Sequence, residues 1–398
     1  MALRTQLNCG SRSVVKILQI FNEVSGGDLG DVPCSNSIDL WTRRCGLAAY
    51  QESACRFSDQ DYCLIADESM MIGSSKLFLT LATPAEHHGH PLCHEDMSVL
   101  GIDVAESFNG ERVCEALQRA AGRTGHAPSY VITDNASIMR KGVRLTGQKH
   151  HYDVSHSLGM YLERTYKNDS EFNDLSKQVA QIQFRHNMKP IAYILPPKQR
   201  SISRFINMDG WVKWCKNVLN IYHWLGKEEQ EALKCVRTYA SLIEELSEVM
   251  ACMRHIEDIC KQKGLSSTTA QLCIQHVRDT LFRGNQRMRN LAQSVIAFFV
   301  REAALVDKGE VHHNSTDIIE STFGIYKERM SPNKLYGATS MILTIPALQM
   351  VKSSHGGRTM DVGEHLTRAK VTELEKWKLN TFQTNLVSKR NRVLKMGA

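Results

Sequence analysis

Two aspartates stand at the ends of apolar runs, where a lone carboxylate needs a compensating partner. Asp67 closes the run CLIAD and Asp134 closes the run YVITD, so each is expected at the edge of a buried strand. An uncompensated carboxylate there is costly, which predicts a metal ion, an arginine or a group of N–H donors beside it. A single aspartate at a strand end is most often a turn residue, but two at matching positions favour a shared site.

A third carboxylate lies in the segment DIIESTFGIYKER. Ser315 is a suitable cap for a helix that contains Glu320 and ends before Pro332. Magnesium prefers hard oxygen ligands and keeps several waters, so a few carboxylates are enough to bind it. Asp67 and Asp134 are therefore candidate ligands.

Two neighbouring carboxylates are weaker candidates. Glu328 lies on the same predicted helix as the third carboxylate, but Lys327 and Arg329 flank it, which is typical of a solvated face. Glu68 follows Asp67 directly and alternates to the opposite face if the strand continues. We therefore do not expect Glu68 to be a ligand, and Glu328 is the first alternative to the predicted third ligand.

The elements that must position these residues form a mixed α/β order in the segment 57–157. Short apolar runs indicate strands, and two stretches with helical spacing indicate helices. Three strands are followed by a helix, a strand, a helix and a fifth strand, which predicts a mixed sheet. The predicted strands are 62–66, 76–82, 99–104, 129–133 and 150–154, and the predicted helices are 111–123 and 136–142.

The next segment contains almost nothing that indicates a strand. Apolar residues recur at steps of three and four through Glu231–Lys263 and again through Thr268–Val306. This pattern predicts an all-helical domain inserted into the α/β unit, with a first internal turn at Pro196-Pro197. The predicted organisation is therefore 1–56, 57–157, 158–310 (the insertion), 311–345 (the final catalytic helix) and 346–398 (a basic helical tail).

The N-terminal segment 1–56 is expected to be helical. One helix is predicted over Ser11–Val24, and a second from Ser35 to Cys45 with Gly46 as its stop. Two short helices with the basic pair Arg43 and Arg44 are typical of a helix-turn-helix that binds DNA. The alternative is a small helical cap on the next domain.

The composition favours a folded intracellular chain with a polyanionic partner. Its 398 residues allow two or three domains, and 42% of them are hydrophobic. No apolar run is long enough to span a membrane, and the start, MALRTQLNCGSRS, has no apolar leader. The 12 cysteines include no CxxC pair, which is typical of reduced thiols. Lys and Arg number 49 against 42 Asp and Glu, so the net charge is +7.

A dense group of metal-ligand types lies between the second and third predicted strands. It consists of His87, His88, His90, Cys93 and His94. No second pair at finger-like spacing follows, which argues against a structural zinc site and favours adventitious metal binding. A zinc-dependent hydrolase built on this group is a third, weaker alternative for the function.

The ordered set of carboxylates resembles the Asp-Asp-Glu (DDE) transposases, whose catalytic domain has the RNase H-like fold. Between the fifth strand and the following helix the chain has Asp153-Val-Ser-His156, which is similar to that family's Asp-x-x-His or Cys-x-x-His signature. The stretch PCSNSIDLWTRRCGL is similar to the helix-turn-helix of bacterial insertion-sequence transposases. The resemblance covers residues 11–330, and the helical insertion precedes Glu320 as in that family.

The resemblance implies a chemistry for these residues. Asp67 would bridge two Mg²⁺ ions, with Asp134 and Glu320 each binding one, and Mn²⁺ would substitute. Such ions, roughly 3.5–4 Å apart, stabilise both the attacking and leaving oxygens at phosphorus. His156 would lie near the metals, or else be a helix-start histidine tethered through Asp153. The implied partners are double-stranded DNA and further copies of the chain in a dimer or larger assembly, in a bacterial cytoplasm and at its nucleoid.

The candidate DNA-binding residues are basic or aromatic. In transposases that make hairpin ends, an insertion-domain tryptophan stacks on a flipped base, although a spacing of three between the first two tryptophans here favours a core role. Basic residues also occur in the tail, at 389–395. The candidates are Arg43, Arg44, Arg140, Lys141, Arg144, Lys198, Arg200, Arg204, Trp211 and Trp214, with Trp224 close by.

Two further functions compete with a transposase that binds inverted repeats, cuts DNA and joins 3′-hydroxyls to a target. A nuclease of the same fold would cleave without joining strands. A catalytically silent, transposon-derived regulator would bind DNA and never cut it, although all three carboxylates are present in the chain.

Overall fold

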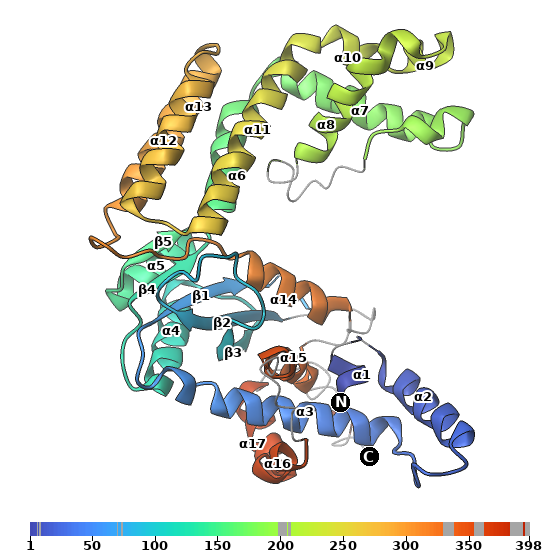
Figure 1. Cartoon of the computed structure of the whole chain (residues 1–398), viewed down its shortest axis with the longest axis vertical. Helices are drawn as coiled ribbons and strands as arrows, with labels where there is room; N and C mark the ends of the chain where they lie inside the picture. Colours follow the sequence, from blue (N-terminus) through green and yellow to red (C-terminus); the bar gives the residue numbers. More distant parts are fainter. Residues whose placement is uncertain are drawn as a thin grey trace. The chain divides into compact units, whose positions relative to one another are not determined.

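The computed structural model describes residues 1–5, 7, 9–69, 71–72, 75–197, 205, 208–328, 338–353, 362–382 and 393–394. The chain divides into two units, which we call the sheet unit and the helical unit (Figure 1). The sheet unit contains Met1–Glu86, Pro91–His151 and Ser315–Ala398, and the helical unit contains His87–His90 and Tyr152–Asn314.

The sheet unit is built on a five-stranded mixed sheet, as the sequence predicts. The strand order is β3-β2-β1-β4-β5. β1 pairs antiparallel with β2 and parallel with β4, and β2 pairs antiparallel with β3. The strands are β1 (Tyr62–Glu68), β2 (Lys76–Pro84), β3 (Ser98–Ala105), β4 (Tyr130–Thr133) and β5 (His150–Tyr152).

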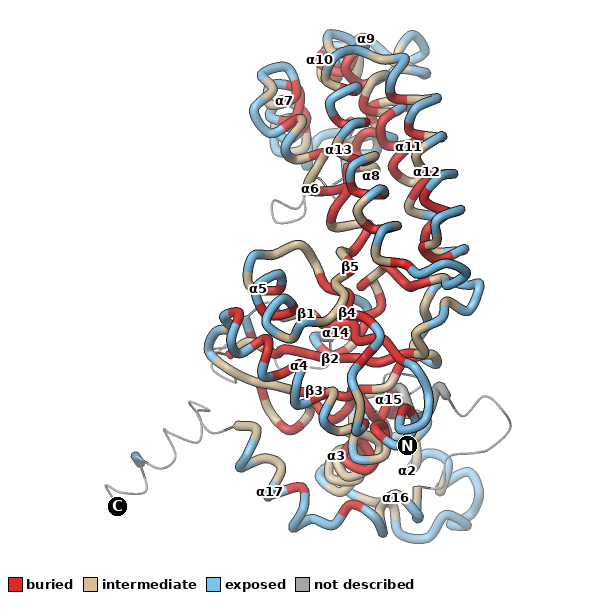
Figure 2. The backbone as a smooth tube through the Cα atoms, turned by 90° about the vertical axis from the view of Figure 1, so that its left-hand side faces the viewer, coloured by how far each residue is buried: buried red, intermediate tan, exposed pale blue. Residues whose placement is uncertain are grey.

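Helices α4 (Gly110–Thr124) and α5 (Ser137–Thr146) cover one face of this sheet. Their apolar stripes bury Val113, Leu117 and Val143 against Leu64 and Val131 of the central strands. The Asn109 side chain accepts a hydrogen bond from the Arg112 N–H at 2.9 Å and so caps α4. This face therefore has its own apolar core, and Figure 2 shows the strands largely buried.

The opposite face of the sheet is covered by segments from both ends of the chain. Ile319 and Phe323 pack on it together with Leu47, Ala48 and Leu343. The helices that belong to these segments are α3 (Ser35–Glu52), α14 (Asp317–Glu328), a 3-10 turn η5 (Ser340–Leu343), α15 (Thr344–Ser353), α16 (Val362–Arg368) and α17 (Val371–Thr381).

The predicted stop of the second N-terminal helix is wrong. α3 continues through Gly46 to Glu52. A Cβ at Gly46 would lie 1.8 Å from the Leu343 carbonyl oxygen, so the glycine permits a close helix approach and does not terminate the helix. The first helix is predicted correctly, at α2 (Ser11–Val24), and follows α1 (Ala2–Thr5). With Leu47 and Ala48 in the sheet core, α3 packs as the helical cap that was the alternative prediction.

The helical unit has one extended apolar core. Its helices bury residues at steps of three and four, such as Leu246, Val249 and Met253, as the sequence pattern predicts. Its limits, Tyr152 and Asn314, are a few residues wider than the predicted insertion. The helices are α6 (Val154–Tyr166), α7 (Ser170–His186), α8 (Asp209–Ile221), α9 (Lys227–Ala232), α10 (Lys234–Thr238), α11 (Ala240–Lys263), α12 (Ser267–Leu281) and α13 (Gln286–Ala303).

Short 3-10 turns complete the described elements, and a membrane-crossing helix is not among them. Of the helices in the described ranges, none combines the length and the apolar character needed to cross a bilayer. The remaining 3-10 turns are Cys55–Phe57, Pro190–Ile194 and Tyr222–Trp224.

Candidate active site

The parallel pairing of β1 and β4 places the two strand-end aspartates at the same edge of the sheet. Ile65 pairs with Ile132, the last residues paired between these strands. Asp67 lies two residues further along β1, and Asp134 directly follows the end of β4. Because the two strands run parallel, both aspartates lie at the carboxyl ends of their strands.

Asp67 belongs to the face of the sheet that α14 covers. Side chains alternate between faces along a strand. Ile65 of β1 and Ile132 of β4 belong to the same core as Ile319 and Phe323 of α14. Asp67 lies two residues beyond Ile65 in β1 and so continues this face, whereas Asp134 lies in the turn after β4.

Each aspartate has one carboxylate oxygen oriented by the backbone. The Glu68 N–H donates to Asp67 Oδ1 at 2.7 Å, and the Ala136 N–H donates to Asp134 Oδ1 at 3.1 Å. The second contact forms a turn of the kind that aspartate favours, and α5 begins directly after it. Asp134 therefore acts as a turn residue directly after β4.

Glu320 is positioned by the helix that packs on this face. Ile319 and Phe323 of α14 are buried in the core, whereas Glu320, between them, is exposed. The Asp317 N–H donates to Ser315 Oγ at 3.3 Å, which supports the predicted helix start. Across the described ranges, no three Asp, Glu, His or Cys side chains converge as a set that could bind a metal ion. The structure thus places Asp67 and Asp134 at the same edge of the sheet and Glu320 on a helix that packs on the sheet. Their joint role as metal ligands stays a prediction.

The two alternative carboxylates lie outside this pair. Glu68 forms an ion pair with Lys76 of the adjacent strand, with 2.6 Å between Oε1 and Nζ. This contact explains Glu68 without a metal, as expected from the alternation. Glu328 is the last residue of α14, and its side chain lies outside the described part of the chain.

The Asp-x-x-His segment forms the start of α6 in the helical unit. Asp153 is completely buried and accepts a hydrogen bond from the His156 N–H at 2.6 Å. This contact is a helix N-cap, which was the alternative prediction for the pair. The catalytic role of His156 stays a prediction, since the structure assigns its backbone, not its ring, to Asp153.

Two of the predicted DNA-binding arginines have exposed side chains on the helix that follows Asp134. Arg140 and Arg144 are exposed on α5, one turn apart, and form no ion pair with any described residue. Lys141 between them differs, because its Nζ lies 2.5 Å from Glu111 Oε1 on α4. This contact lowers the pKa of the Glu111 carboxyl below its usual range. Arg140 and Arg144 are thus the stronger candidates for phosphate contacts.

The basic pair on α3 has partners within the sheet unit. Arg44 Nε donates to the Ala369 carbonyl at 2.7 Å and Nη2 to the Leu366 carbonyl, both at the end of α16. Arg43 Nη1 donates to Ser340 Oγ at 3.3 Å. These contacts give both arginines a structural role, and their predicted role in DNA binding is left untested. Lys198, Arg200, Arg204 and the basic residues at 389–392 and 395 lie outside the described residues.

The three tryptophans of the helical unit differ in how far they are buried. Trp211 is only 3% exposed and packs near Phe172, so it is a core residue and is removed from the DNA-binding candidates. Trp214 is half-buried, and its indole N–H donates to the Ile194 carbonyl at 2.9 Å. Trp224, which sequence reasoning ranked no higher than the other two, is 79% exposed in the structure. The sequence pattern around Trp224 does not predict this exposure.

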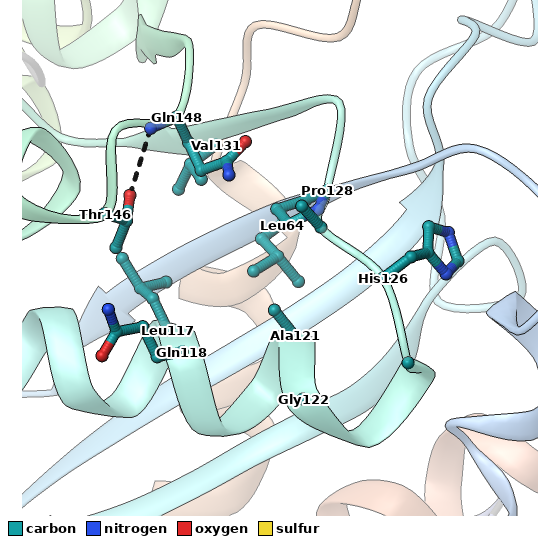
Figure 3. A pocket seen from close by; sticks show the side chains of 12 residues that line it. Leu64, Leu117, Gln118, Ala121, Gly122, His126, Pro128, Val131, Thr146 and Gln148 are labelled. Carbon is teal, nitrogen blue, oxygen red and sulfur yellow. Dashed lines mark hydrogen bonds between the residues drawn. The ribbon is translucent and has the colours of Figure 1, made fainter.

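A separate pocket in the sheet unit lies away from the aspartates. It has a cavity volume of about 330 Å³ and is lined by Leu64 and Val131 on the α4 face of the sheet (Figure 3). Gln148 donates its backbone N–H to Thr146 Oγ1 at 3.3 Å at the rim. Because Leu64 and Val131 point away from the α14 face, this pocket is distinct from the candidate site.

In comparisons with protein-family models and with curated proteins, the chain finds no match. The candidate site therefore depends on the chain's own residues: Asp67 and Asp134 at the ends of parallel strands, with Glu320 on the covering helix.

Proposed function

We propose that the chain is a DNA transposase of the DDE type, with an RNase H-like catalytic domain interrupted by a helical insertion. The observation that carries the proposal is the parallel pairing of β1 and β4, at whose carboxyl ends Asp67 and Asp134 lie. Two carboxylates that share a site repel each other unless a cation or proton is shared between them.

The arrangement of elements supports the fold part of the proposal. Three antiparallel strands lead into α4, β4, α5 and β5, and the helical unit then intervenes before α14. This is the order expected for the RNase H-like fold from the sequence. The chain returns to the sheet unit at Ser315. Helix α14 can therefore contribute a third carboxylate.

The donor set suits divalent cations with hard oxygen preference. Asp67 and Asp134 would bind a shared ion between them, and Glu320 would supply an oxygen to a second ion from the α14 side. Bound Mg²⁺ or Mn²⁺ would activate a water or 3′-hydroxyl and stabilise the leaving oxygen. The backbone N–H groups of Glu68 and Ala136 orient the carboxylates toward that role. Glu320 is exposed, so it can adjust its rotamer when DNA and metal arrive.

DNA affinity would come from basic groups close to the carboxylates. Arg140 and Arg144 follow Asp134 on α5 and face solvent. Exposed guanidinium groups that no carboxylate neutralises are suited to phosphate contacts, which position the duplex without reading its sequence. Because two element ends must be held together, we expect the active form to be a dimer or a larger assembly on DNA.

A strand-transfer assay tests this function. The substrate is the pair of inverted repeats that flank the gene, offered pre-cut together with a target plasmid and Mg²⁺ or Mn²⁺. Joined product from the wild type, absent from Asp134→Ala, supports a transposase. Cleavage without joined product would assign a nuclease of the same fold instead. Binding without cleavage in either metal would assign a silent DNA-binding regulator.

A further inference from the structure

The helical unit brings together two histidine-rich segments that are more than 200 residues apart in sequence. The His87 N–H donates to the Val311 carbonyl at 2.8 Å, which joins the segment 87–90 to the segment 310–313. His312 exchanges two backbone hydrogen bonds with Leu265, at 2.8 and 2.9 Å, and the Val154 N–H donates to the Asn314 carbonyl at 3.0 Å. The 310–313 segment is thus fixed on three sides, and its histidines have defined positions.

Four imidazole rings from these two segments lie close together. The ring centres of His87 and His313 are 4.9 Å apart, those of His88 and His313 are 5.6 Å apart, and those of His88 and His90 are 5.9 Å apart. With metal–nitrogen bonds of roughly 2.0–2.1 Å and tetrahedral angles, ring centres that share one zinc ion lie about 5 Å apart. The observed spacings are close to that separation.

The histidines of the two segments differ in their contacts and exposure. His87 Nδ1 accepts from the Gly89 N–H at 2.9 Å, so its Nε2 carries the proton and donates to the Lys261 carbonyl at 3.1 Å. His312 Nε2 contacts Glu310 Oε2 at 2.8 Å. His88 and His90 are exposed on the 87–90 turn, whereas His313 is 2% exposed.

A glycine permits this arrangement. Gly264 has a φ of +68°, and a Cβ there would lie 2.6 Å from both His87 Cγ and Val311 Cγ1. Any side chain at this position would therefore separate the two segments where they meet. The close approach of the histidines depends on a backbone adapted to it.

We propose that His88, His90 and His313 bind a transition-metal ion of the zinc class, with water as the fourth ligand. Imidazole is a preferred ligand of zinc, copper and nickel, and poorly suited to the magnesium expected at the carboxylates. The three rings do not yet converge on one point among the described residues, so binding requires rotation of the exposed His88 and His90 side chains toward His313. The ion would fasten the 87–90 turn to the 310–313 segment. It would do so independently of Asp67, Asp134 and Glu320.

The test is titration of the full-length, tag-free and chelator-treated chain with ZnCl₂ by calorimetry at neutral pH. Co²⁺ absorbance provides a second readout of tetrahedral nitrogen ligation. We expect one tight site per chain in the wild type and in Asp67→Asn, because the carboxylates are not its ligands. Loss of an outer-sphere partner commonly weakens metal binding about 10–100-fold, so His88→Ala combined with His90→Ala should weaken it more than about 100-fold. Both side chains are exposed, so this variant should fold.

The matched control removes two other exposed histidines of the same unit, His223 and His255. This control is stringent because His255 and His276 form another close imidazole pair, with 4.2 Å between ring centres. His223→Ala combined with His255→Ala should keep the wild-type affinity. The proposal is overturned if the wild type binds no zinc tightly, if the His88/His90 variant keeps its affinity, or if the control loses as much.

Discussion

Asp67 and Asp134 lie at the same edge of the sheet, because β1 and β4 run parallel with Ile65 paired to Ile132. Asp67 lies two residues after Ile65, and Asp134 lies two residues after Ile132. Glu68, the next residue on β1, is paired with Lys76 of the adjacent strand. Glu68 therefore already has a cationic partner, which separates it from the two candidate ligands.

Asp67→Asn should be more stable than the wild type in chelator and should lack the gain in stability that metal gives the wild type. Without a divalent cation the proposed site holds like charges, so removing one of them should raise the unfolding midpoint. With Mg²⁺ or Mn²⁺, the wild type should gain stability and Asp67→Asn should not, because the shared site is lost. Thermal unfolding in EDTA and in excess metal measures both effects.

Glu68→Gln is the matched control for that experiment. It removes one charge from the same strand, and losing the partly exposed pair with Lys76 should cost about 0–1 kcal/mol. Its gain in stability with metal should equal that of the wild type. If Asp67→Asn still gains stability with metal as the wild type does, Asp67 is not a ligand.

Arg140 and Arg144 should contribute to DNA affinity through phosphates. Replacing both by alanine should weaken binding to any duplex, and should reduce the slope of log affinity against log salt by about 0.9 per lost contact. Lys141→Ala should change this slope less, because Lys141 is paired with Glu111. Fluorescence anisotropy over a range of KCl concentrations gives the slopes. Equal effects of all three basic residues would show that only total charge matters.

Most of the elements could be predicted from the sequence because each depends on local pattern. All five strands fall within a few residues of the apolar runs that predict them, and the insertion follows from its helical spacing. The stop at Gly46 was wrong because a glycine inside a helix gives the same signal as a terminating glycine. Only the contact with Leu343, almost 300 residues later, distinguishes them.

Gly46→Ala should destabilise the sheet unit. Its Cβ would overlap the Leu343 carbonyl, and a backbone atom cannot move aside as a flexible side chain can. Such overpacking costs about 1–3 kcal/mol, and chemical denaturation should report it.

Gly122→Ala provides the comparison for this substitution. Gly122 lies inside α4, and a Cβ added there would meet no described atom within 4 Å, so alanine should be neutral or stabilising by up to about 1 kcal/mol. If both substitutions have the same effect, the close approach of α3 to Leu343 is absent in solution.

Cys34 should be the most reactive of the exposed thiols near neutral pH. A hydrogen bond with the Ser37 side chain, 3.3 Å from Sγ to Oγ, lowers the pKa of the Cys34 thiol and raises its thiolate fraction at pH 7. Ser37→Ala should slow its labelling by a disulfide reagent at that pH, and the difference should vanish as pH rises past the ordinary thiol pKa. Peptide mass spectrometry measures the rates. The rate of exposed Cys55 should not change, and an unchanged Cys34 rate would contradict the assignment.

The candidate site could be predicted only in part. The types and order of Asp67, Asp134 and Glu320 are visible in the sequence, but the register between β1 and β4 is a long-range property that no local pattern fixes. The contacts of Arg44 could not be predicted either. Its basic side chain suggests an exposed position, but it donates to the carbonyls of Leu366 and Ala369. The meeting of the 87–90 and 310–313 histidines is likewise a product of folding.

The most direct test of the proposed carboxylate site is metal-dependent cleavage of the gene's own inverted-repeat ends. The proteins compared are the wild type, Asp67→Ala, Glu320→Ala and Glu68→Gln. We expect cleavage by the wild type and by Glu68→Gln in Mn²⁺ or Mg²⁺. We expect none above background by Asp67→Ala or Glu320→Ala, with folding and DNA binding retained. Cleavage by Asp67→Ala at the wild-type rate would contradict the proposed site, because Asp67 would then have no part in the chemistry.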